Sequence, residues 1–436
     1  MNEILRRRRL IFASTAGNIL EWYDFISFGF MLNIISNHFF PSSSPTSALL
    51  MSAGTFGAAY VMRPIGGVIF GIYADRHGRK SALLWVIALM SLSTAMIGFS
   101  PTYQSIGVVA SVLLVVARLL QGASAGGEFG SATSLLIESA PAEKRGLYGS
   151  FQLFSQYAAG FLAAVTGALI TLALTPAQLD AWGWRVPFLF GLLIGPVGLY
   201  VRRKIDEPEE FKVASRTAGK RSAAAILWSV LRAHPRELLV TTGLVGGMAI
   251  LQFVFGVFMP TFATRYLKLS PQIPFIIISI TAILRMIVCP AFGALSDRLG
   301  RKPVMAWGYA LMLVSVYPLF VWVVHAPSFF TLFTAEIVFS ILSAMCLGPV
   351  STTVAEIFPT EIRSTSVSVS YNVASTVFGG FTPFIITLLI QRTGDLLSIA
   401  YYVTFGVVLG LVSTLFLPPM SSGIRSGTTS ASPRIG

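Results

Sequence analysis

Long apolar segments, each about the length needed to cross a lipid bilayer, dominate this sequence of 436 residues. A membrane-spanning helix needs about 20 consecutive, mostly apolar residues. Only 11% of the residues are charged, against about a quarter in soluble globular proteins, and the mean hydropathy is +0.74. The sequence therefore predicts an all-α membrane protein with twelve transmembrane helices, near residues 10–36, 47–72, 81–100, 106–138, 146–174, 185–203, 237–263, 273–295, 303–324, 328–357, 364–391 and 398–418.

The basic residues explain the net charge of +13 without nucleic acid, because they form short clusters between apolar segments. On one side of the predicted membrane lie residues 6–9, 76–80, 144–145, most of 202–236, 298–302, Arg363 and the tail. The opposite loops hold only Arg185, Arg265, Lys268 and Arg392. Cytoplasmic loops carry an excess of Lys and Arg. We therefore expect both termini to be cytoplasmic.

Two short motifs occur twice, about half the chain apart. "GIYADRHGRK" at 71–80 and "GALSDRLGRK" at 293–302 share the pattern Gly-x-x-x-Asp-Arg-x-Gly-Arg-Lys. "IESAPAEKRG" and "AEIFPTEIRS" align Glu138, Pro141 and Arg145 with Glu356, Pro359 and Arg363, at an offset of 218. The second half therefore reads as a copy of the first, and parallel repeats of this kind are typical of transporters. The predicted divisions are a six-helix bundle (1–203), a cytoplasmic linker (204–236), a second six-helix bundle (237–420) and a disordered tail (421–436).

These repeats, together with four further motifs, carry a family resemblance. "GNILEWYDF" (17–25), "MRPIGG" (62–67), "RLLQGASAGGEFG" (118–130) and "WGWRVPF" (182–188) resemble the metabolite:proton symporters of the major facilitator superfamily. "SFQLFSQ" (150–156) and "GGFTPFI" (379–385) resemble its citrate and tricarballylate branch. The resemblance implies a monomer in a bacterial inner membrane that moves an organic tri- or dicarboxylate together with protons. Relatives that carry oxoglutarate, shikimate, or proline and betaine share much of the pattern.

The resemblance also implies that the repeated loops latch the two halves together on the cytoplasmic side. A carboxylate at such a loop can interact with the positive N-terminus of a neighbouring helix or pair with arginines. The alternative is that the basic residues only anchor the topology, although topology alone needs neither the aspartates nor the glycines. The predicted latch residues are Gly71, Asp75, Arg76, Gly78, Arg79, Arg145, Gly293, Asp297, Arg298, Gly300, Arg301 and Arg363.

Ionisable residues inside a span are costly, so each is a functional candidate. Arg118 and Arg285 lie near mid-span, one in each half, and the guanidinium fork suits a carboxylate. We expect this pair to clamp the anion. The alternative is a buried pair that only fixes helix packing, which is the interpretation we favour for Arg63. The polar residues predicted to complete the substrate site are Asn18, Gln121, Gln152, Gln156, Tyr371 and Asn372.

Four carboxylates are predicted to couple transport to protons: Glu21, Asp24, Glu128 and Glu336. A carboxyl group in a poorly hydrated cavity can take up a proton near neutral pH. The offset of 218 places Glu336 at the position that Arg118 holds in the first half. Protonation would remove a repelling negative charge as the anion brings its own.

Other classes of function are disfavoured. "GASAG" (122–126) matches a hydrolase nucleophile motif but lies inside a predicted helix, and the four histidines lie in loops or at span ends. No Walker sequence indicates ATP, and Cys289 and Cys346 offer no metal spacing, so we expect neither an enzyme, a cofactor nor a metal. The expected partners are a small organic anion, protons and the lipid bilayer. A zwitterionic osmolyte carrier and a non-transporting membrane sensor remain the alternatives.

Overall fold

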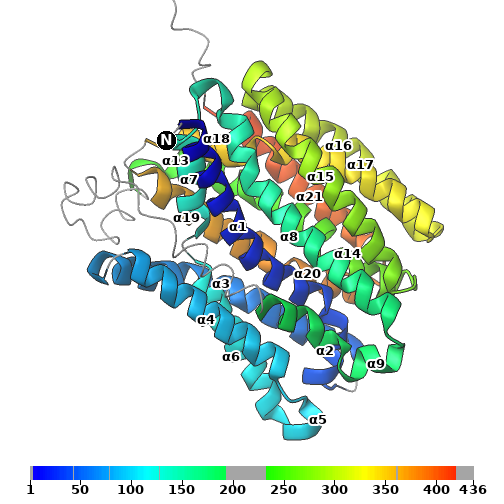
Figure 1. Ribbon diagram of the computed structural model, residues 1–436. Helices are drawn as coiled ribbons and strands as arrows, with labels where there is room; N and C mark the ends of the chain where they lie inside the picture. The colour runs from blue at the N-terminus through cyan, green and yellow to red at the C-terminus, as the bar shows by residue number, and fades with distance from the viewer. Residues whose placement is uncertain are drawn as a thin grey trace, which may run out of the picture.

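The computed structural model of the chain describes residues 3–42, 44–77, 79–126, 128–192, 232–359 and 362–418, with side chains omitted at 3–14, 16, 20, 71, 72, 74–77, 79, 80, 82, 83, 128, 131 and 135. All regular secondary structure in these ranges is helical (Figure 1). Of the linker predicted at 204–236, only residues 232–236 lie within these ranges. The helix α13 already begins there, at Pro235. The predicted tail at 421–436 also lies outside them.

The helices of the first half follow the predicted spans in order. Two spans consist of paired helices, α1 with α2 and α6 with α7. Residues 186–192 are helical and begin the sixth predicted span. The helices are Glu3–Phe30 (α1), Leu32–Phe39 (α2), Pro45–His77 (α3), Arg79–Phe99 (α4), Tyr103–Ile106 (α5), Val108–Ser124 (α6), Glu128–Glu138 (α7), Arg145–Ala173 (α8) and Pro176–Ala181 (α9).

The helices of the second half repeat this plan. Three stretches of π-helix interrupt it, at Val254–Phe258, Phe262–Tyr266 and Ser375–Gly380. Such bulges are frequent at functional sites. The α-helices are Pro235–Phe253 (α13), Met259–Thr261 (α14), Gln272–Leu299 (α15), Arg301–His325 (α16), Phe329–Leu347 (α17), Val350–Ile357 (α18), Arg363–Ala374 (α19), Thr382–Thr393 (α20) and Ser398–Leu415 (α21).

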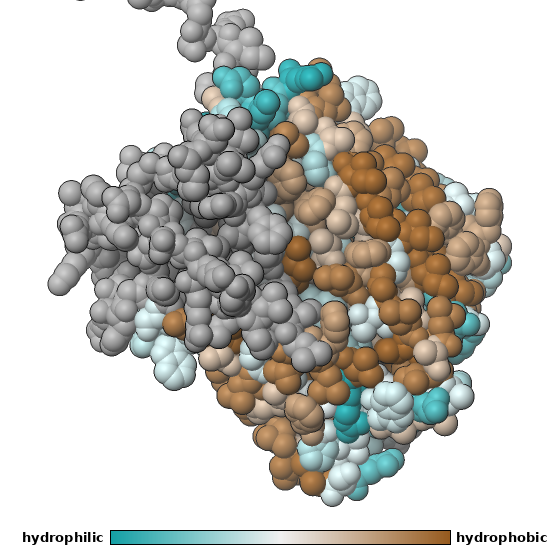
Figure 2. Space-filling view, in the orientation of Figure 1, coloured by the Kyte–Doolittle hydropathy of each residue, from teal (hydrophilic) through white to brown (hydrophobic). Residues whose placement is uncertain are grey.

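The surface of the bundle is that of an integral membrane protein. Large apolar side chains are exposed on the outer helices, including Leu239, Trp307 and Val314, which are 75%, 65% and 75% exposed. In Figure 2, hydrophobic residues cover most of the visible described surface, and hydrophilic residues gather at its two ends. Seven helical segments within the described residues are long and apolar enough to cross a membrane, and two shorter apolar helices accompany them. The predicted all-α membrane fold is confirmed.

Close helix packing in the first half depends on glycine. A Cβ atom on Gly122 of α6 would collide with the carbonyl oxygen of Ala59 on α3, and one on Gly126 would collide with the carbonyl oxygen of Arg63. Small residues let transmembrane helices approach at backbone distance. The "GASAG" stretch therefore packs against α3. It is not wholly inside a helix as expected, because α6 ends at Ser124 and residues 125–126 form a turn.

The two halves meet along several helix pairs, chiefly α8 with α15, α7 with α19 and α3 with α20. We call the end of the bundle that carries the repeated motifs, near the start of α8 and the turn between α15 and α16, the motif end. There α7, α18 and α19 lie together, while α2, α5 and α9 lie at the opposite end (Figure 1). The interface between the halves thus runs from one end of the molecule to the other.

Candidate functional site

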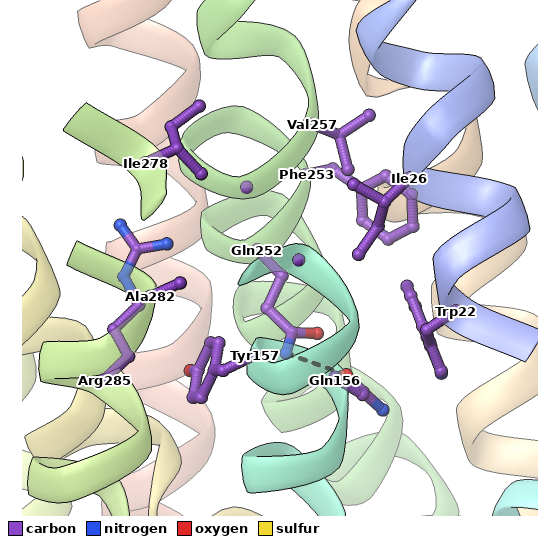
Figure 3. Close-up of a pocket in the computed structure, with 12 residues that line it drawn as sticks. Trp22, Ile26, Gln156, Tyr157, Gln252, Phe253, Val257, Ile278, Ala282 and Arg285 are labelled. Carbon is purple, nitrogen blue, oxygen red and sulfur yellow. Dashed lines mark hydrogen bonds between the residues drawn. The ribbon is translucent and has the colours of Figure 1, made fainter. Parts of the chain in front are cut away.

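A pocket lies between the two halves, where residues from the interior of α1, α8 and α15 face one another (Figure 3). Its cavity measures about 40 Å³, which holds only a few water molecules, so a substrate requires the pocket to widen. The helices α1 and α8 supply one wall, while α13, the first π-helical stretch and α15 supply the other. The lining residues are Trp22, Ile26, Gln156, Tyr157, Gly160, Gln252, Phe253, Gly256, Val257, Ile278, Ala282 and Arg285.

Polar side chains from both halves meet in the middle of this pocket. The Gln252 amide donates a hydrogen bond of 2.9 Å to the side-chain oxygen of Gln156. Trp22 and Phe253 lie on one side of this glutamine pair and Arg285 lies on the opposite side (Figure 3). The ring centroids of Trp22 and Phe253 are 6.1 Å apart. The pocket is therefore polar in its centre and aromatic at one wall.

Arg285 brings the single formal charge among the lining residues. Its Nε donates to Ser340 Oγ and its Nη2 donates to Glu336 Oε2, both at 2.8 Å. Arg285 is 4% exposed and Glu336 is 1% exposed, so this ion pair is buried between α15 and α17. The other carboxylate oxygen of Glu336 has no hydrogen-bond partner among the described residues. Tyr157 completes the group, with its ring centroid 6.0 Å from the guanidinium carbon of Arg285.

Arg118 lies elsewhere in this conformation. It is fully buried in the first half, and its guanidinium carbon is 4.9, 4.2 and 5.1 Å from the ring centroids of Phe25, Phe28 and Phe56. One nitrogen donates to Gln121, while Nε and Nη2 have no hydrogen-bond partner among the described residues. Neither Arg118 nor Gln121 lines the pocket. The predicted two-arginine clamp therefore stays a prediction that would require the pocket to change shape.

Asn18 and Gln152 lie behind the pocket wall, between α1 and α8. Asn18 donates to Ser155 Oγ at 2.6 Å and to the backbone carbonyl of Gln152 at 3.3 Å. Both residues are buried, and neither lines the pocket. In this conformation they join two helices of the same half.

Two carboxylates of α1 are also buried away from the pocket. Glu21 pairs with Arg63 at 3.3 Å, and the guanidinium carbon of Arg63 lies 4.4 Å from the ring centroid of Tyr60. Asp24 accepts a hydrogen bond of 2.5 Å from Thr94 on α4. The pairing of Glu21 with Arg63 fits the packing role favoured for that arginine. The side chain of Glu128 lies outside the described residues.

Two residues of α19, Tyr371 and Asn372, join the halves near the motif end. The ring of Tyr371 stacks on Phe129 with centroids 3.5 Å apart and planes at 7°. Asn372 donates to the backbone carbonyl of Gly126 at 2.9 Å. These contacts cross from α19 to α7 and its preceding turn, so in this conformation both residues hold the halves together rather than line the pocket.

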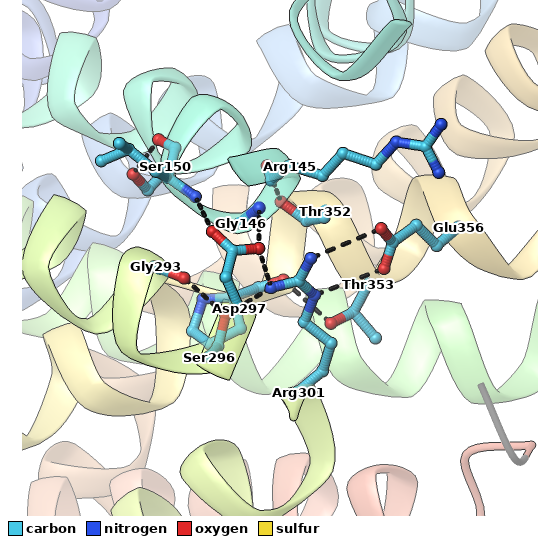
Figure 4. A network of polar contacts seen from close by, with 12 residues as sticks. Arg145, Gly146, Ser150, Gly293, Ser296, Asp297, Arg301, Thr352, Thr353 and Glu356 are labelled. Carbon is cyan, nitrogen blue, oxygen red and sulfur yellow. Dashed lines mark hydrogen bonds and ion pairs between the residues drawn. The ribbon is translucent and has the colours of Figure 1, made fainter. Parts of the chain in front are cut away.

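The second copy of the repeated motif joins the halves at the motif end (Figure 4). Asp297 at the end of α15 accepts hydrogen bonds from the backbone N–H groups of Gly146 and Leu147, at 2.8 and 3.0 Å. These donors belong to the first turn of α8, where no helical carbonyl is available. Arg301 binds Asp297 at 2.7 Å and Glu356 at 3.3 Å. A carboxylate of one half thus caps a helix of the other.

Further contacts surround this cap. Thr352 donates to the backbone carbonyl of Arg145 at 3.0 Å, and Arg363 pairs with Glu138 across the halves at 3.0 Å. A Cβ atom on Gly293 would lie 2.6 Å from the carbonyl oxygen of Gly146, so α15 and α8 approach at backbone distance here. Gly300 turns the chain into α16 with a φ of 93°, which favours glycine.

The remaining latch residues are Arg298 and the first copy of the motif. Arg298 is exposed and makes no ion pair or hydrogen bond with another of the described residues. In the first copy of the motif, Gly71 belongs to α3, Gly78 lies outside the described residues, and so do the side chains of Asp75, Arg76 and Arg79. The predicted latch role of the first copy stays a prediction.

Sequence reasoning missed three contributors to these sites. Tyr157 and Gln252 line the pocket, and Glu356 binds Arg301. Gln252 is a polar residue in an apolar span, and Glu356 belongs to the second repeated motif. Both could therefore have been recognised as site candidates from the sequence. Tyr157 follows Gln156 directly in the sequence, and nothing in its pattern separates it from the many packing aromatics.

Comparison with known proteins places these features in a family. The model of the family described as "Sugar (and other) transporter" matches residues 10–422. A citrate-proton symporter of Klebsiella pneumoniae is 37% identical over 92% of this chain and 90% of its own length. A proline/betaine transporter of Salmonella typhimurium is 30% identical over 97% of this chain and 86% of its own.

Solved structures support the same fold. A crystal structure of a D-xylose-proton symporter superimposes with a TM-score of 0.74 and 19% identity, covering 94% of this chain and 96% of that one. A partially occluded, inward-open xylose transporter from E. coli gives a TM-score of 0.75 at 17% identity, covering 96% and 99%. These relatives are transporters, which agrees with the expectation that the chain is not an enzyme. With the doubled motifs and the pocket between its halves, the chain belongs to the sugar (and other) transporter family of the major facilitator superfamily.

Proposed function

We propose that the protein is a secondary transporter that takes up an organic tri- or dicarboxylate, such as citrate or tricarballylate, in symport with protons. One observation carries the proposal: a buried arginine, Arg285, borders a pocket between the two halves. The guanidinium group binds carboxylates through two parallel hydrogen bonds. Relatives named as citrate-proton symporters, at 37% and 34% identity, support this substrate class.

Transport would proceed by rocking the half near 1–203 against the half near 237–420 around the pocket. The structure has contacts between the halves at both ends. Asp297 and Arg363 make them at the motif end, and Arg265 donates to Asn33 at 3.0 Å near the opposite end. Each end would open in turn when its contacts separate. By the charge distribution of the loops, the motif end and both termini face the cytoplasm, in a bacterial inner membrane.

Protons would enter through the buried carboxylates. Glu21, Asp24 and Glu336 are each at most 5% exposed, and Glu128 is the fourth candidate. An anion that enters a pocket in the membrane interior adds a charge that the protein must balance. A proton taken up by one of these groups balances it, so the proton gradient would drive accumulation of the anion.

A second candidate is proton-coupled uptake of a zwitterionic osmolyte such as proline or betaine. The proline/betaine transporters at 30–31% identity favour it. So does the aromatic wall of the pocket, because Trp22 and Phe253 could contact a quaternary ammonium group. Arg285 would then hold the single carboxylate of the zwitterion. Both candidates share one site and differ in the charge of the substrate.

Uptake of radiolabelled citrate into proteoliposomes with an inward proton gradient tests the proposal. We expect accumulation that a proton ionophore abolishes, and competition by tricarballylate but not by betaine. Arg285→Gln should lower the apparent affinity about ten- to a hundredfold, because it removes a charge-assisted hydrogen bond to the substrate. Arg298→Gln, a matched change at an exposed arginine, should leave uptake unchanged. Accumulation of betaine without uptake of citrate would replace the first candidate by the second.

A further inference from the structure

Arg265 lies between the two halves near the end of the bundle opposite the motif end, which we call the distal end. It belongs to the π-helical stretch Phe262–Tyr266, and its Nη1 donates to Oδ1 of Asn33 on α2 at 3.0 Å. Arg265 makes no ion pair with another of the described residues, whereas Arg63 and Arg285 each pair with a glutamate. A guanidinium group whose partner is a neutral amide keeps a positive charge that a carboxylate can neutralise.

Two hydroxyl groups beside this arginine lack partners as well. The Tyr266 hydroxyl lies near both Arg265 and Thr387 of α20. Neither the Tyr266 nor the Thr387 hydroxyl has a hydrogen-bond partner among the described residues, and Thr387 is 0% exposed. Buried polar groups nearly always form hydrogen bonds, and leaving one without a partner is costly. The three side chains, which we call the distal cluster, therefore offer donors to an acceptor that no described residue supplies.

The distal cluster shares a helical span with the pocket but is separate from it. The span Pro235–Tyr266 includes Gln252 and Val257, which line the pocket. Arg265 follows Val257 by eight positions, about 12 Å along a helix axis, and does not line the pocket. The cluster therefore lies between the pocket and the distal end, on the route of a substrate that enters there.

The charges around the distal end also favour an anion. Besides Arg265, the described residues of the loops and helix ends there include Arg185, Lys268, Arg392, Asp180 and Asp395. Neither aspartate forms an ion pair with an arginine or a lysine among the described residues. An excess of one sign of charge at the mouth of a cleft raises the local concentration of the oppositely charged substrate.

We infer that the distal cluster is a second carboxylate site, which receives one carboxylate group of the transported anion while the distal end is open. This inference rests on the proposed function and adds a site to its route. Arg265 donates to one carboxylate oxygen, and the hydroxyls of Tyr266 and Thr387 donate to the other. When the distal end closes, the anion has moved on to the pocket, and Asn33 of the first half replaces it on Nη1.

Initial rates of proton-driven citrate uptake into proteoliposomes, measured over a range of citrate concentrations, test the inference. Arg265→Gln should raise the KM about tenfold and change the maximal rate per protein less than about twofold, because a charge-assisted hydrogen bond to the entering anion is lost. Arg265→Lys, which keeps the charge, should recover most of the loss. Arg392→Gln, a matched change at an exposed arginine of the same end, should leave the KM unchanged. An unchanged KM in Arg265→Gln would overturn the inference while citrate transport stands.

Two further variants separate a binding site from a contact that only closes the distal end. Asn33→Ala removes the same hydrogen bond as Arg265→Gln but leaves the cation, so its KM should stay at or below the wild-type value. Thr387→Val keeps the shape without the hydroxyl and should raise the KM about threefold, and Thr387→Ser should restore it. A KM raised as much by Asn33→Ala as by Arg265→Gln would overturn the inference. A wild type that takes up no citrate would overturn the proposed function itself.

Discussion

At the scale of single residues, Asp297 illustrates how a charge can join two domains without an ion pair between them. Its carboxylate accepts two backbone N–H groups at the start of α8, and Arg301 of its own half holds it in place at 2.7 Å. The first N–H groups of a helix lack internal partners and carry a partial positive charge. The contact therefore combines a helix cap with a charge interaction across the interface.

We predict that Asp297→Asn loosens the motif end. The amide keeps the size of the side chain but loses its charge and one acceptor oxygen, which weakens closure by about 1–3 kcal/mol. The readout is alkylation of Thr352→Cys, which lies buried at this interface, by a water-soluble thiol reagent. The rate should rise about five- to a hundredfold, since each 1.4 kcal/mol is a factor of about 10. Arg298→Gln in the same loop should leave the rate unchanged, and an unchanged rate in Asp297→Asn would refute the role of the cap.

Residue types at the site could be predicted, but their partners could not. Arg285 and Glu336 stand out in the sequence because ionisable residues are rare inside spans. They are 51 positions apart on different helices, and only the packing of α15 against α17 brings them within 2.8 Å. Arg118 carries the same signal in the sequence, yet three phenylalanine rings surround it. Helical periodicity predicts the face on which a side chain lies, not the neighbour that it meets.

At the scale of helices, the contact between α3 and α6 depends on glycines that face backbone rather than side chains. A Cβ atom on Gly122 would collide with the carbonyl oxygen of Ala59. Backbone atoms cannot avoid the collision by changing rotamer, as a flexible side chain can. The two helices would have to separate to accept any larger residue at this position.

We predict that Gly122→Ala lowers the stability of the protein by about 1–3 kcal/mol, the usual effect of overpacking a tight contact. Gly54→Ala on α3 is the matched control, because its Cβ would lie at an ordinary 3.8 Å from Phe384. Thermal unfolding in detergent should show a lower midpoint for Gly122→Ala and little change for Gly54→Ala. Equal midpoints for the two variants would contradict the close approach of α3 and α6.

Helix positions could largely be predicted, and their interruptions could not. The apolar segments near 273–295, 303–324 and 398–418 correspond to α15, α16 and α21 with small shifts at the ends. The π-helical stretches at Val254–Phe258 and Ser375–Gly380 left no such signal. A π-helical turn holds one residue more than an α-helical turn but can be just as hydrophobic. Only packing against the other half therefore distinguishes the two kinds of turn.

At the scale of the whole molecule, the repeated motifs predict two duplicated halves, but they carry no information about how the halves pack against each other. The contacts made by Asp297, Thr352 and Arg363 hold the motif end together, while Arg265 and Asn33 join the halves near the other end. A transport cycle requires each set of contacts to separate in turn. The central claim of this account is that the halves must part at the motif end for the substrate to cross.

A disulfide across the motif end tests this claim most directly. A Cβ atom on Gly149 of α8 would lie 3.2 Å from Cβ of Thr352 on α18, close enough for Gly149→Cys and Thr352→Cys to form a bond. Gly243→Cys with Ser413→Cys is the matched control, because that pair lies within the second half at 3.3 Å. Both pairs would be placed in a chain whose native Cys289 and Cys346 are replaced by alanine.

The measurement is proton-driven citrate accumulation in proteoliposomes before and after oxidation, and again after reduction. We predict that oxidation abolishes accumulation in the pair across the halves, that reduction restores it, and that the pair within one half transports throughout. Undiminished accumulation by the fully oxidised pair across the halves would contradict the account, because the motif end would then not need to open.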